Sequence, residues 1–331
     1  MFEVSAAATR SKLRILCYHG FSYGDEHEYQ PILFMQPGVF RKRMEYLHGA
    51  GYRVLALAEG LARLKAGTLP AKAVVLTFDD GWQGIADHAI PVVRQLGFPA
   101  TVYVTTSYVE NRIPVVHVFV KYLLWKTERA SLDLARIDSG LARAFSLDSR
   151  GQRDAAADAV SQYCDMQLTP DAQREFCLRV AAELDVDTAC LASGAFQMME
   201  KTTLAALDEQ GIDIQLHTHR HRPATESDAA LVEEIELNRM VLATCTKRRL
   251  EHLCYPDGIY SRVQQSCLRR MQIASATTTE LGLVDRSTPL YELPRLLDAD
   301  HLSSLDFAAE ISGFAHLQRR LRKRMRRVRR P

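Results

Sequence analysis

Hydrophobic residues occur along the chain in short continuous runs that alternate with segments of helical spacing. Predominantly apolar segments at residues 13–19, 73–81 and 100–106 are typical of strands buried on both faces, and the segment 73–81 ends in two acids and a glycine. Apolar positions within residues 40–47 recur every three to four residues, which is typical of a helix with one buried face. This alternation of strands and helices predicts an α/β fold built on a parallel sheet.

The pattern changes in the middle of the chain. Residues 107–194 are rich in Ala, Arg and Asp, have helical spacing, and are interrupted by turn-forming sequences. The alternation then resumes with a helix near 201–210 and a strand at 212–216. The sequence therefore predicts a single domain over residues 1–318 with a helical insertion at about 107–194, followed by a basic C-terminal tail at 319–331.

Composition is ordinary for a folded protein, with 47% hydrophobic and 25% charged residues. The seven cysteines show no Cys-x-x-Cys spacing, which favours reduced thiols in a cytoplasmic protein. The first twenty residues lack the pattern of a secretory signal, and no apolar run is long enough for a membrane span. These features predict a cytoplasmic protein.

Polar residues with metal-binding chemistry follow two of the predicted strands. Asp79 and Asp80 precede Gly81 at the end of one strand, and His217 and His221 follow another. The carboxyl ends of parallel strands meet at one rim, so these side chains are expected to converge. Two imidazoles and one carboxylate suit Zn²⁺ or a similar cation, held by Asp80, His217 and His221, with Asp79 as general base.

Each motif alone has a simpler interpretation. An isolated Asp-Asp-Gly is usually a turn with solvated acids, and a cluster of histidines can be a surface loop. Their joint occurrence, each after a buried strand, favours the metal site. The histidine between the two expected ligands is not predicted to bind the metal.

These motifs resemble those of a known family. "LTFDDG" (76–81) with the downstream "HTHRH" (217–221) resembles the polysaccharide deacetylases of carbohydrate esterase family 4. "LCYHGF" (16–21) and "YPDGIYS" (255–261) continue the resemblance, which is closest to the branch that deacetylates poly-N-acetylglucosamine. It implies a distorted (β/α) barrel of seven strands that hydrolyses N-acetyl groups of sugars.

The resemblance also implies roles for further residues. The backbone N–H of Asp257 is expected to hold the oxyanion, and His19 to be the general acid, since histidine titrates close to neutrality. The chain departs from the family's commonest form by placing Cys254 where an arginine is usual. Arg295 either orients Asp79 in its place or is a surface arginine after a proline turn.

Other features keep two interpretations each. Trp82 and Tyr255 either line a sugar-binding cleft or belong to the core. The apolar segment at residues 115–125 forms either a lid over the barrel mouth or a buried helix against the barrel. Asp257 stands where the family often has an aromatic residue, which leaves the substrate open.

The resemblance predicts a metal-dependent hydrolase that removes N-acetyl groups from amino sugars of a glycan or glycan precursor, in bacterial cell-surface polysaccharide metabolism. The alternatives are a deformylase or amidase on a small or lipid-linked amino sugar, and a catalytically silent glycan-binding barrel. Zn²⁺ is the first expectation for the cation, with Co²⁺, Ni²⁺ and Fe²⁺ as alternatives.

The excess of basic over acidic residues in the chain comes from its C-terminal segment. Nine of the twelve residues at 319–330 are Arg or Lys, so the remainder is net acidic although the whole chain carries +2. This segment suits the inner face of an anionic membrane, the phosphates of a nucleic acid, or solvent. The acidic remainder, without interleaved aromatics, argues against nucleic acid.

Overall fold

A computed structural model describes residues 1–111, 114–141 and 143–328. Within these residues, seven parallel strands form a closed ring, because β1 pairs with both β5 and β12. A further strand, β4 (Arg53–Val54), pairs with β5 outside the ring. The ring follows the order β1 (Arg14–Tyr18), β5 (Ala73–Phe78), β6 (Thr101–Val104), β9 (Asp213–Leu216), β10 (His252–Cys254), β11 (Ser275–Leu281) and β12 (Leu293–Leu297).

The distorted seven-stranded barrel is therefore confirmed. The strands β1 and β5 form where the sequence is predominantly apolar, and all of their residues are buried. The strand β12, which completes the ring, was not predicted, because Pro294 lies inside it and proline is usually excluded from central strands. A register shift between β11 and β12 distorts the barrel at this place.

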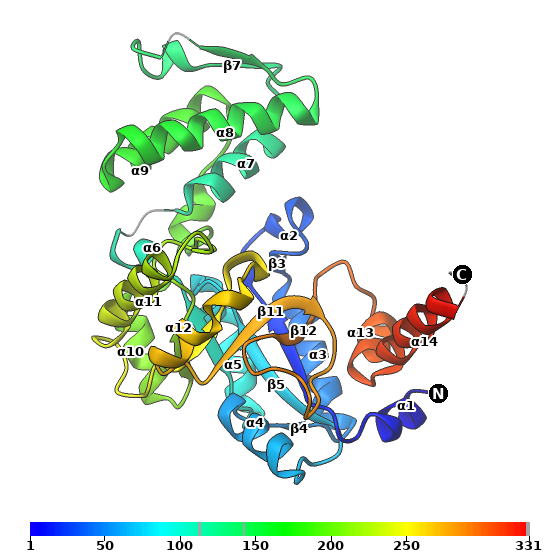
Figure 1. Cartoon of the computed structure of the whole chain (residues 1–331). Coiled ribbons are helices and arrows are strands. Elements are labelled where there is room, and N and C mark those ends of the chain that lie inside the picture. The colour runs from blue at the N-terminus through cyan, green and yellow to red at the C-terminus, as the bar shows by residue number, and fades with distance from the viewer. Residues whose placement is uncertain (112–113, 142, 329–331) are drawn as a thin grey trace.

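Helices surround the barrel (Figure 1). The helix α3 begins with a proline at its first turn, and α4 ends at Gly67 in a left-handed conformation, as is usual at helix ends. The outer helices are α3 (Pro37–Gly49), α4 (Leu57–Ala66), α5 (Ile90–Gln95), α10 (Lys201–Glu209), α11 (Asp228–Leu242) and α12 (Gln265–Arg270). Shorter elements precede α3, namely α2 (Glu26–Tyr29), β2 (Gly20–Phe21) and β3 (Phe34–Met35).

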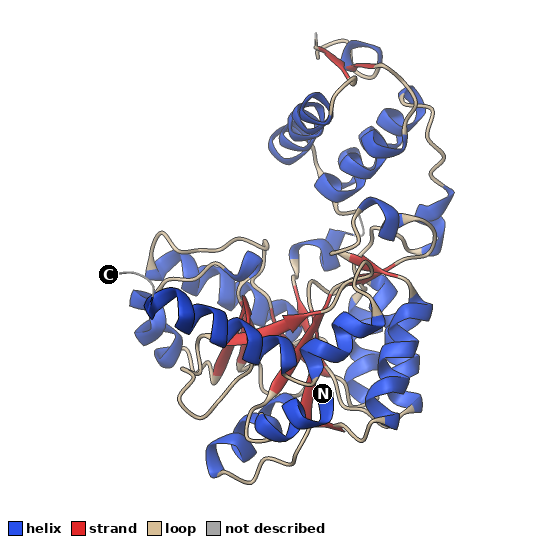
Figure 2. Ribbon diagram, turned by 90° about the vertical axis from the view of Figure 1, so that its right-hand side faces the viewer, coloured by secondary structure: helices blue, strands red, loops and turns tan. Residues whose placement is uncertain are grey.

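The segment between β6 and α10 forms a separate group of helices that projects above the barrel (Figure 2). The central helix α7 packs against α8, α9 and α2. The group also contains a β-hairpin, which the helical pattern of the sequence did not predict. Its elements are α7 (Val116–Lys126), β7 (Ser131–Asp133), β8 (Ala144–Ser146), α8 (Arg150–Gln167) and α9 (Pro170–Glu183), whereas α6 (Ser107–Asn111) lies at the barrel beside α11 (Figure 1).

The two ends of the chain lie on the same side of the barrel (Figure 1). The helices α1 (Phe2–Ala8) and α14 (Phe314–Val328) are in contact, with the rings of Phe2 and Phe314 5.8 Å apart, and α13 (Ser304–Ile311) packs against α14. Residues 319–328 of the basic segment continue α14, while residues 329–331 lie outside the described residues. None of the described helices combines the length and apolar character needed to cross a bilayer.

Candidate metal centre and active site

The carboxyl ends of β5 and β9 bring one carboxylate and two imidazoles together. Asp80 Oδ1 lies 3.1 Å from His217 Nε2 and 3.4 Å from His221 Nε2. One potential ligand atom from each of the three residues lies within 4.8 Å of the others. The side chains of Asp80 and His217 are almost fully buried, and that of His221 is about one-third exposed, so the set opens on one side only.

Neighbouring groups orient this set for a cation. His217 Nδ1 is 2.8 Å from the carbonyl oxygen of Cys254 and must donate to it, which leaves the lone pair of Nε2 facing Asp80. The indole N–H of Trp82 donates to Asp80 Oδ2 at 2.7 Å, which leaves Oδ1 toward the imidazoles. Two imidazole nitrogens and one carboxylate oxygen, held this way, fit a divalent cation with open positions.

The loops that carry these residues have a strained backbone. Asp80, Thr218, His221 and Asp257 all have φ between 54° and 72°, a left-handed conformation that is costly for residues other than glycine. Next to Asp80, Gly81 has φ of 93°, and a side chain there would press on Val104. This clustering of strain at the ends of β5, β9 and β10 is typical of a functional site.

Asp79 points to a different partner, Arg295 of β12. Two guanidinium nitrogens of Arg295 donate to the two oxygens of Asp79 at 2.7 and 2.6 Å. Burial alone would raise the pKa of Asp79, but the charge and hydrogen bonds of Arg295 lower it to about 2. Arg295 is 2% exposed, so its interpretation as a surface arginine is wrong. Arg295 also donates to Cys254 Sγ at 3.2 Å, and the small side chain of Cys254 leaves it room.

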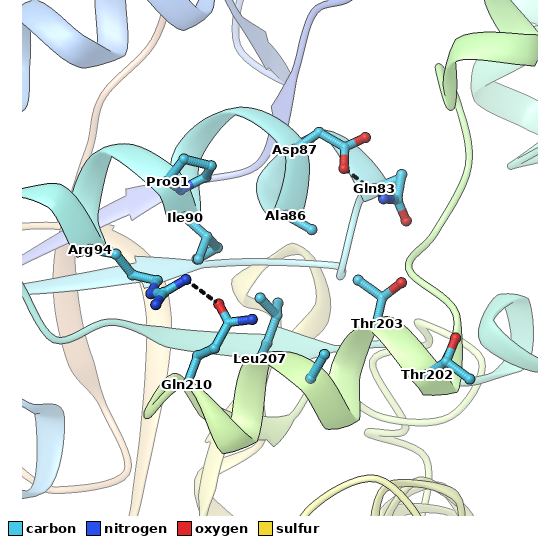
Figure 3. A pocket seen from close by; sticks show the side chains of 11 residues that line it. Gln83, Ala86, Asp87, Ile90, Pro91, Arg94, Thr202, Thr203, Leu207 and Gln210 are labelled. Atoms are coloured by element: carbon cyan, nitrogen blue, oxygen red, sulfur yellow. Dashed lines mark hydrogen bonds between the residues drawn. The ribbon is translucent and has the colours of Figure 1, made fainter.

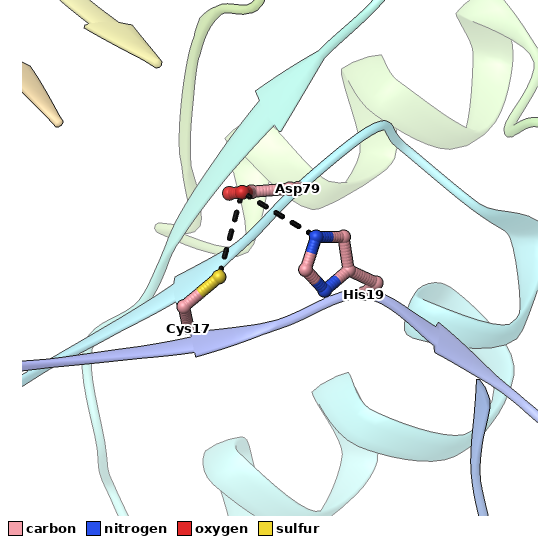
Figure 4. Close-up of side chains that lie close together, drawn as sticks. All are labelled: Cys17, His19 and Asp79. Atoms are coloured by element: carbon pink, nitrogen blue, oxygen red, sulfur yellow. Dashed lines mark hydrogen bonds and ion pairs between the residues drawn. The ribbon is translucent and has the colours of Figure 1, made fainter. Parts of the chain in front are cut away.

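His19 approaches Asp79 from the end of β1 (Figure 4). His19 Nε2 is 3.8 Å from Asp79 Oδ2, which is too long for a hydrogen bond. His19 Nδ1 is buried and has no hydrogen-bond partner among the described residues. The thiols of Cys17 and Cys254 contact the same oxygen at 3.5 and 3.4 Å, an arrangement that no sequence motif indicated.

These groups line a cavity of about 770 Å³ at the mouth of the barrel. Its lining includes His19, Asp79, Arg295, Asp257 and the three expected metal ligands. Such a volume is typical of pockets that bind small organic ligands. The expected catalytic groups and the expected metal site therefore share one substrate-sized space.

The two aromatic residues expected to bind sugar also line this cavity, but little of either is exposed. Trp82 is 3% exposed and packs edge-on against Phe34, while its N–H is used by Asp80. Tyr255 is 6% exposed and its hydroxyl donates to a backbone carbonyl. Two half-buried aromatic residues in the lining, Tyr29 and Tyr108, were not predicted, because they lie outside the sequence motifs that carried the resemblance.

A second, more open cavity of about 460 Å³ lies between α5 and α10 (Figure 3). Its polar groups are mostly paired with one another, as in the bonds from Gln83 to Asp87 and from Arg94 to Gln210. Its lining includes no histidine or cysteine. This cavity therefore lacks the imidazoles that line the cavity at the barrel mouth.

Known proteins share both the sequence and the architecture. A family model described as polysaccharide deacetylase matches residues 66–132 and 170–276, more than half of the chain. The chain belongs to the polysaccharide deacetylase family. The matched ranges contain Asp79, Asp80, His217 and His221, whereas His19 and Arg295 lie outside them.

Individual relatives match this chain over shorter stretches. YxkH of Bacillus subtilis is 34% identical over 94 residues, which cover 28% of this chain and 32% of the relative. The poly-β-1,6-N-acetyl-D-glucosamine N-deacetylase of Escherichia coli K12 is 31% identical over 88 residues, covering 26% of this chain and 13% of the relative. The chain thus spans less than a third of the length of either relative.

Solved structures of similar fold cover nearly the whole chain. The Streptococcus pyogenes deacetylase PplD, in complex with acetate, has a TM-score of 0.61 at 17% identity, covering 91% of this chain and 98% of that chain. IcaB from Ammonifex degensii has a TM-score of 0.54 at 15% identity, covering 91% and 97%. At these identities, the likeness establishes the shared fold.

Proposed function

We propose that this protein is a metal-dependent hydrolase that removes N-acetyl groups from amino sugars of a glycan or its precursor. The observation that carries the proposal is the cluster of Asp80, His217 and His221, which lies beside the ionised carboxylate of Asp79 in one cavity. Zn²⁺ is the preferred cation of such a ligand set, and Co²⁺, Ni²⁺ and Fe²⁺ suit the same donors. The cation supplies Lewis-acid polarisation of the acetyl carbonyl and makes a nearby water molecule more acidic.

The side chains around the cation site have distinct proposed roles. Asp79 is ionised and fixed by Arg295, so it can accept the proton that water loses as it adds to the acetyl carbon. The backbone N–H of Asp257, in the strained loop after β10, is proposed to donate to the oxyanion. When the carbon–nitrogen bond breaks, His19 donates a proton to the departing amine and acetate remains.

Neither Trp82 nor Tyr255 is proposed to stack on the sugar. Trp82 orients the Asp80 carboxylate, and Tyr255 stacks on Tyr260 beneath the Asp257 loop, with ring centroids 5.1 Å apart. Their contribution is to hold the cation ligand and the oxyanion donor in position.

Acetate release tests the proposed reaction directly. The substrates are N-acetylglucosamine, its oligomers, and lipid-linked and nucleotide-linked N-acetylated sugars, each with and without chelator. The proposal predicts chelator-sensitive acetate release that Asp79→Asn reduces by at least about a hundredfold. An N-formyl sugar in the same panel tests the alternative of a deformylase. A wild-type rate in Asp79→Asn would exclude the assigned base, and no hydrolysis of any substrate would favour a silent glycan-binding barrel.

The basic helix α14 is proposed to dock on the cytoplasmic face of an anionic membrane. Leu321 and Met325, one turn apart, are 58% and 49% exposed among arginines, so the helix presents apolar groups within a cationic surface. Basic residues near an anionic surface each contribute about 1 kcal/mol. The free state of all seven cysteines agrees with a reducing compartment.

Flotation with vesicles tests this docking. We expect full-length protein to float with phosphatidylserine-containing vesicles and a chain ending at residue 318 to remain behind, with neither floating on neutral vesicles. If neither chain floats with the anionic vesicles, docking of α14 on a membrane is excluded. Binding of the full chain to DNA of random sequence, without flotation, would favour a nucleic acid instead.

A further inference from the structure

We infer that the helices inserted after β6 form a second wall of the active-site cavity, which binds the part of the substrate next to the acetylated sugar. The substrate class that fits is an N-acetylated amino sugar joined to at least one further sugar or group of similar size. This inference rests on the proposed deacetylase function and adds to it a site that lies outside the barrel.

The helix α7 has two faces with different partners. Phe119, Val120 and Leu123 are fully buried in the core, and α7 packs against α8 and α9. His117 and Lys121, four residues apart and therefore on the same side of the helix, line the cavity. Since α7 is packed on one side and open to the cavity on the other, it is a fixed wall.

This wall stands close to the cation site. The backbone N–H of Ser107, the first residue of α6, donates to the carbonyl oxygen of His219, between the two expected histidine ligands, at 2.9 Å. The next residue, Tyr108, lines the same cavity as Asp80 and His221. A group attached to the sugar at the cation site therefore lies within reach of α6 and α7.

The wall and the neighbouring helix α2 offer the chemistry that carbohydrates need. Tyr29 of α2 and Tyr108 are half-buried aromatic residues of the cavity, and an aromatic face packs against the apolar face of a sugar ring. Tyr29 is held in place by Tyr122 and Trp125 of α7, with ring centroids 6.0 and 5.7 Å away. Lys121, whose Nζ lies 3.5 Å from Asp158 Oδ1 of α8, adds a hydrogen-bond donor for hydroxyl groups at the cavity.

The size of the cavity agrees with a substrate larger than one sugar. A volume of about 770 Å³ lies in the upper part of the range for pockets that enclose ligands of drug size, and one acetamido sugar is smaller than such a ligand. The family model leaves residues 133–169 unmatched, and these include α8, on which α7 packs. The support of the wall is thus a feature of this chain that the family pattern does not include.

The test compares substrates of different length in wild-type protein and wall variants. Acetate release is measured with N-acetylglucosamine and its short oligomers for wild type, Tyr108→Ala, Tyr108→Phe and Lys121→Ala. We expect wild type to prefer oligomers, and the oligomer-to-monosaccharide ratio of kcat/KM to fall about tenfold in Tyr108→Ala and Lys121→Ala, mainly through KM. Tyr108→Phe should keep the preference, because it keeps the ring. Lys42→Ala, an exposed lysine on the barrel helix α3, is the matched control and should change nothing.

Calorimetric binding of an oligomer to metal-free protein gives a second readout that does not need turnover. Weaker binding by Tyr108→Ala, with Tyr108→Phe and Lys42→Ala like wild type, would support the wall. Acetate release with the same length preference in every variant, or oligomer binding unaffected by Tyr108→Ala, would overturn it. If wild type with a divalent cation hydrolyses no sugar, the proposed function fails, and the calorimetric comparison still decides on the wall.

Discussion

Replacing Arg295 by methionine removes the only guanidinium that contacts the buried carboxylate of Asp79 among the described residues. Both groups are at most 3% exposed, so no water replaces the two hydrogen bonds of 2.7 and 2.6 Å. Breaking a buried ion pair from one side costs about 3–5 kcal/mol, because the remaining charge stays in the interior without compensation. Arg295→Met should therefore lower the free energy of unfolding by about this amount.

Activity should fall for a separate reason. Arg295 also donates to the carbonyl oxygen of Thr278 and to the hydroxyl of Thr77, at 2.9 and 3.2 Å, so it fixes the orientation of Asp79 relative to the barrel wall. A displacement of a catalytic group by about 1 Å can cost about a hundredfold in rate. We expect kcat for acetate release to decrease by about that factor, with a smaller change in KM.

Two further variants distinguish this explanation from general damage. Asp79→Asn/Arg295→Met removes both charges and should regain part of the lost stability while remaining inactive. Arg262→Met breaks an exposed pair with Glu292 and should cost at most about 1 kcal/mol without affecting activity. Urea unfolding and acetate release measure both quantities. Wild-type stability in Arg295→Met, or a double variant less stable than the single, would refute the reasoning.

Three other predictions concern stability, cation affinity and the loop after β10. Burial raises the pKa of Asp298 from its ordinary 3.8 to about 6, despite Arg43, so the folded state holds this proton more tightly than the unfolded chain. The stability that this proton contributes is present below pH 4 and is lost, by up to about 3 kcal/mol, as the pH rises through 6. In urea unfolding between pH 4 and 7, Asp298→Asn should remove this pH dependence. An unchanged dependence of the unfolding free energy on pH would contradict the assignment. Trp82→Phe removes the hydrogen bond to Asp80 and should weaken Zn²⁺ binding about 10–100-fold in competition with a chelating dye, whereas equal affinity would show that the bond is unimportant. Gly258 has φ of 71°, and a side chain added there would clash with Thr279. Gly258→Ala should therefore lower the free energy of unfolding by about 2 kcal/mol or more, measured by thermal unfolding, and should lower kcat. Wild-type values of both would mean that the loop is free to shift.

The sequence predicted those parts of the fold that depend on local pattern. The strand before Asp79 is a nearly continuous apolar run, and the strand before His217 alternates apolar and polar residues, so their positions and the convergence of their ends could be inferred. The strand β12 could not, because Pro294 interrupts its pattern and only the closure of the ring places it between β11 and β1. The position of Arg295 depended on that strand, which left its two interpretations open until the fold was known.

The residues that line the cavity away from the barrel could likewise not be predicted from local sequence pattern. Tyr29 and Tyr108 lie outside the sequence motifs that carried the resemblance, and the packing of α7 against α2 and α8 positions the helices at the barrel mouth. Residues 115–125 were expected either over the barrel mouth or buried against the barrel. The helix α7 lines the cavity at the barrel mouth, and its buried face packs against α8 and α9 instead of the barrel. Contacts between distant segments of this kind have no counterpart in the spacing of residues along the chain.

The metal content of the purified protein tests the central claim most directly. Elemental analysis after dialysis against Zn²⁺ and removal of the free ion should give one bound equivalent for wild type. Asp80→Ala and His217→Ala should retain almost none, while Asp79→Asn and the surface variant Lys42→Ala should bind like wild type. Full retention of Zn²⁺ by Asp80→Ala and His217→Ala would show that the three side chains do not form the site.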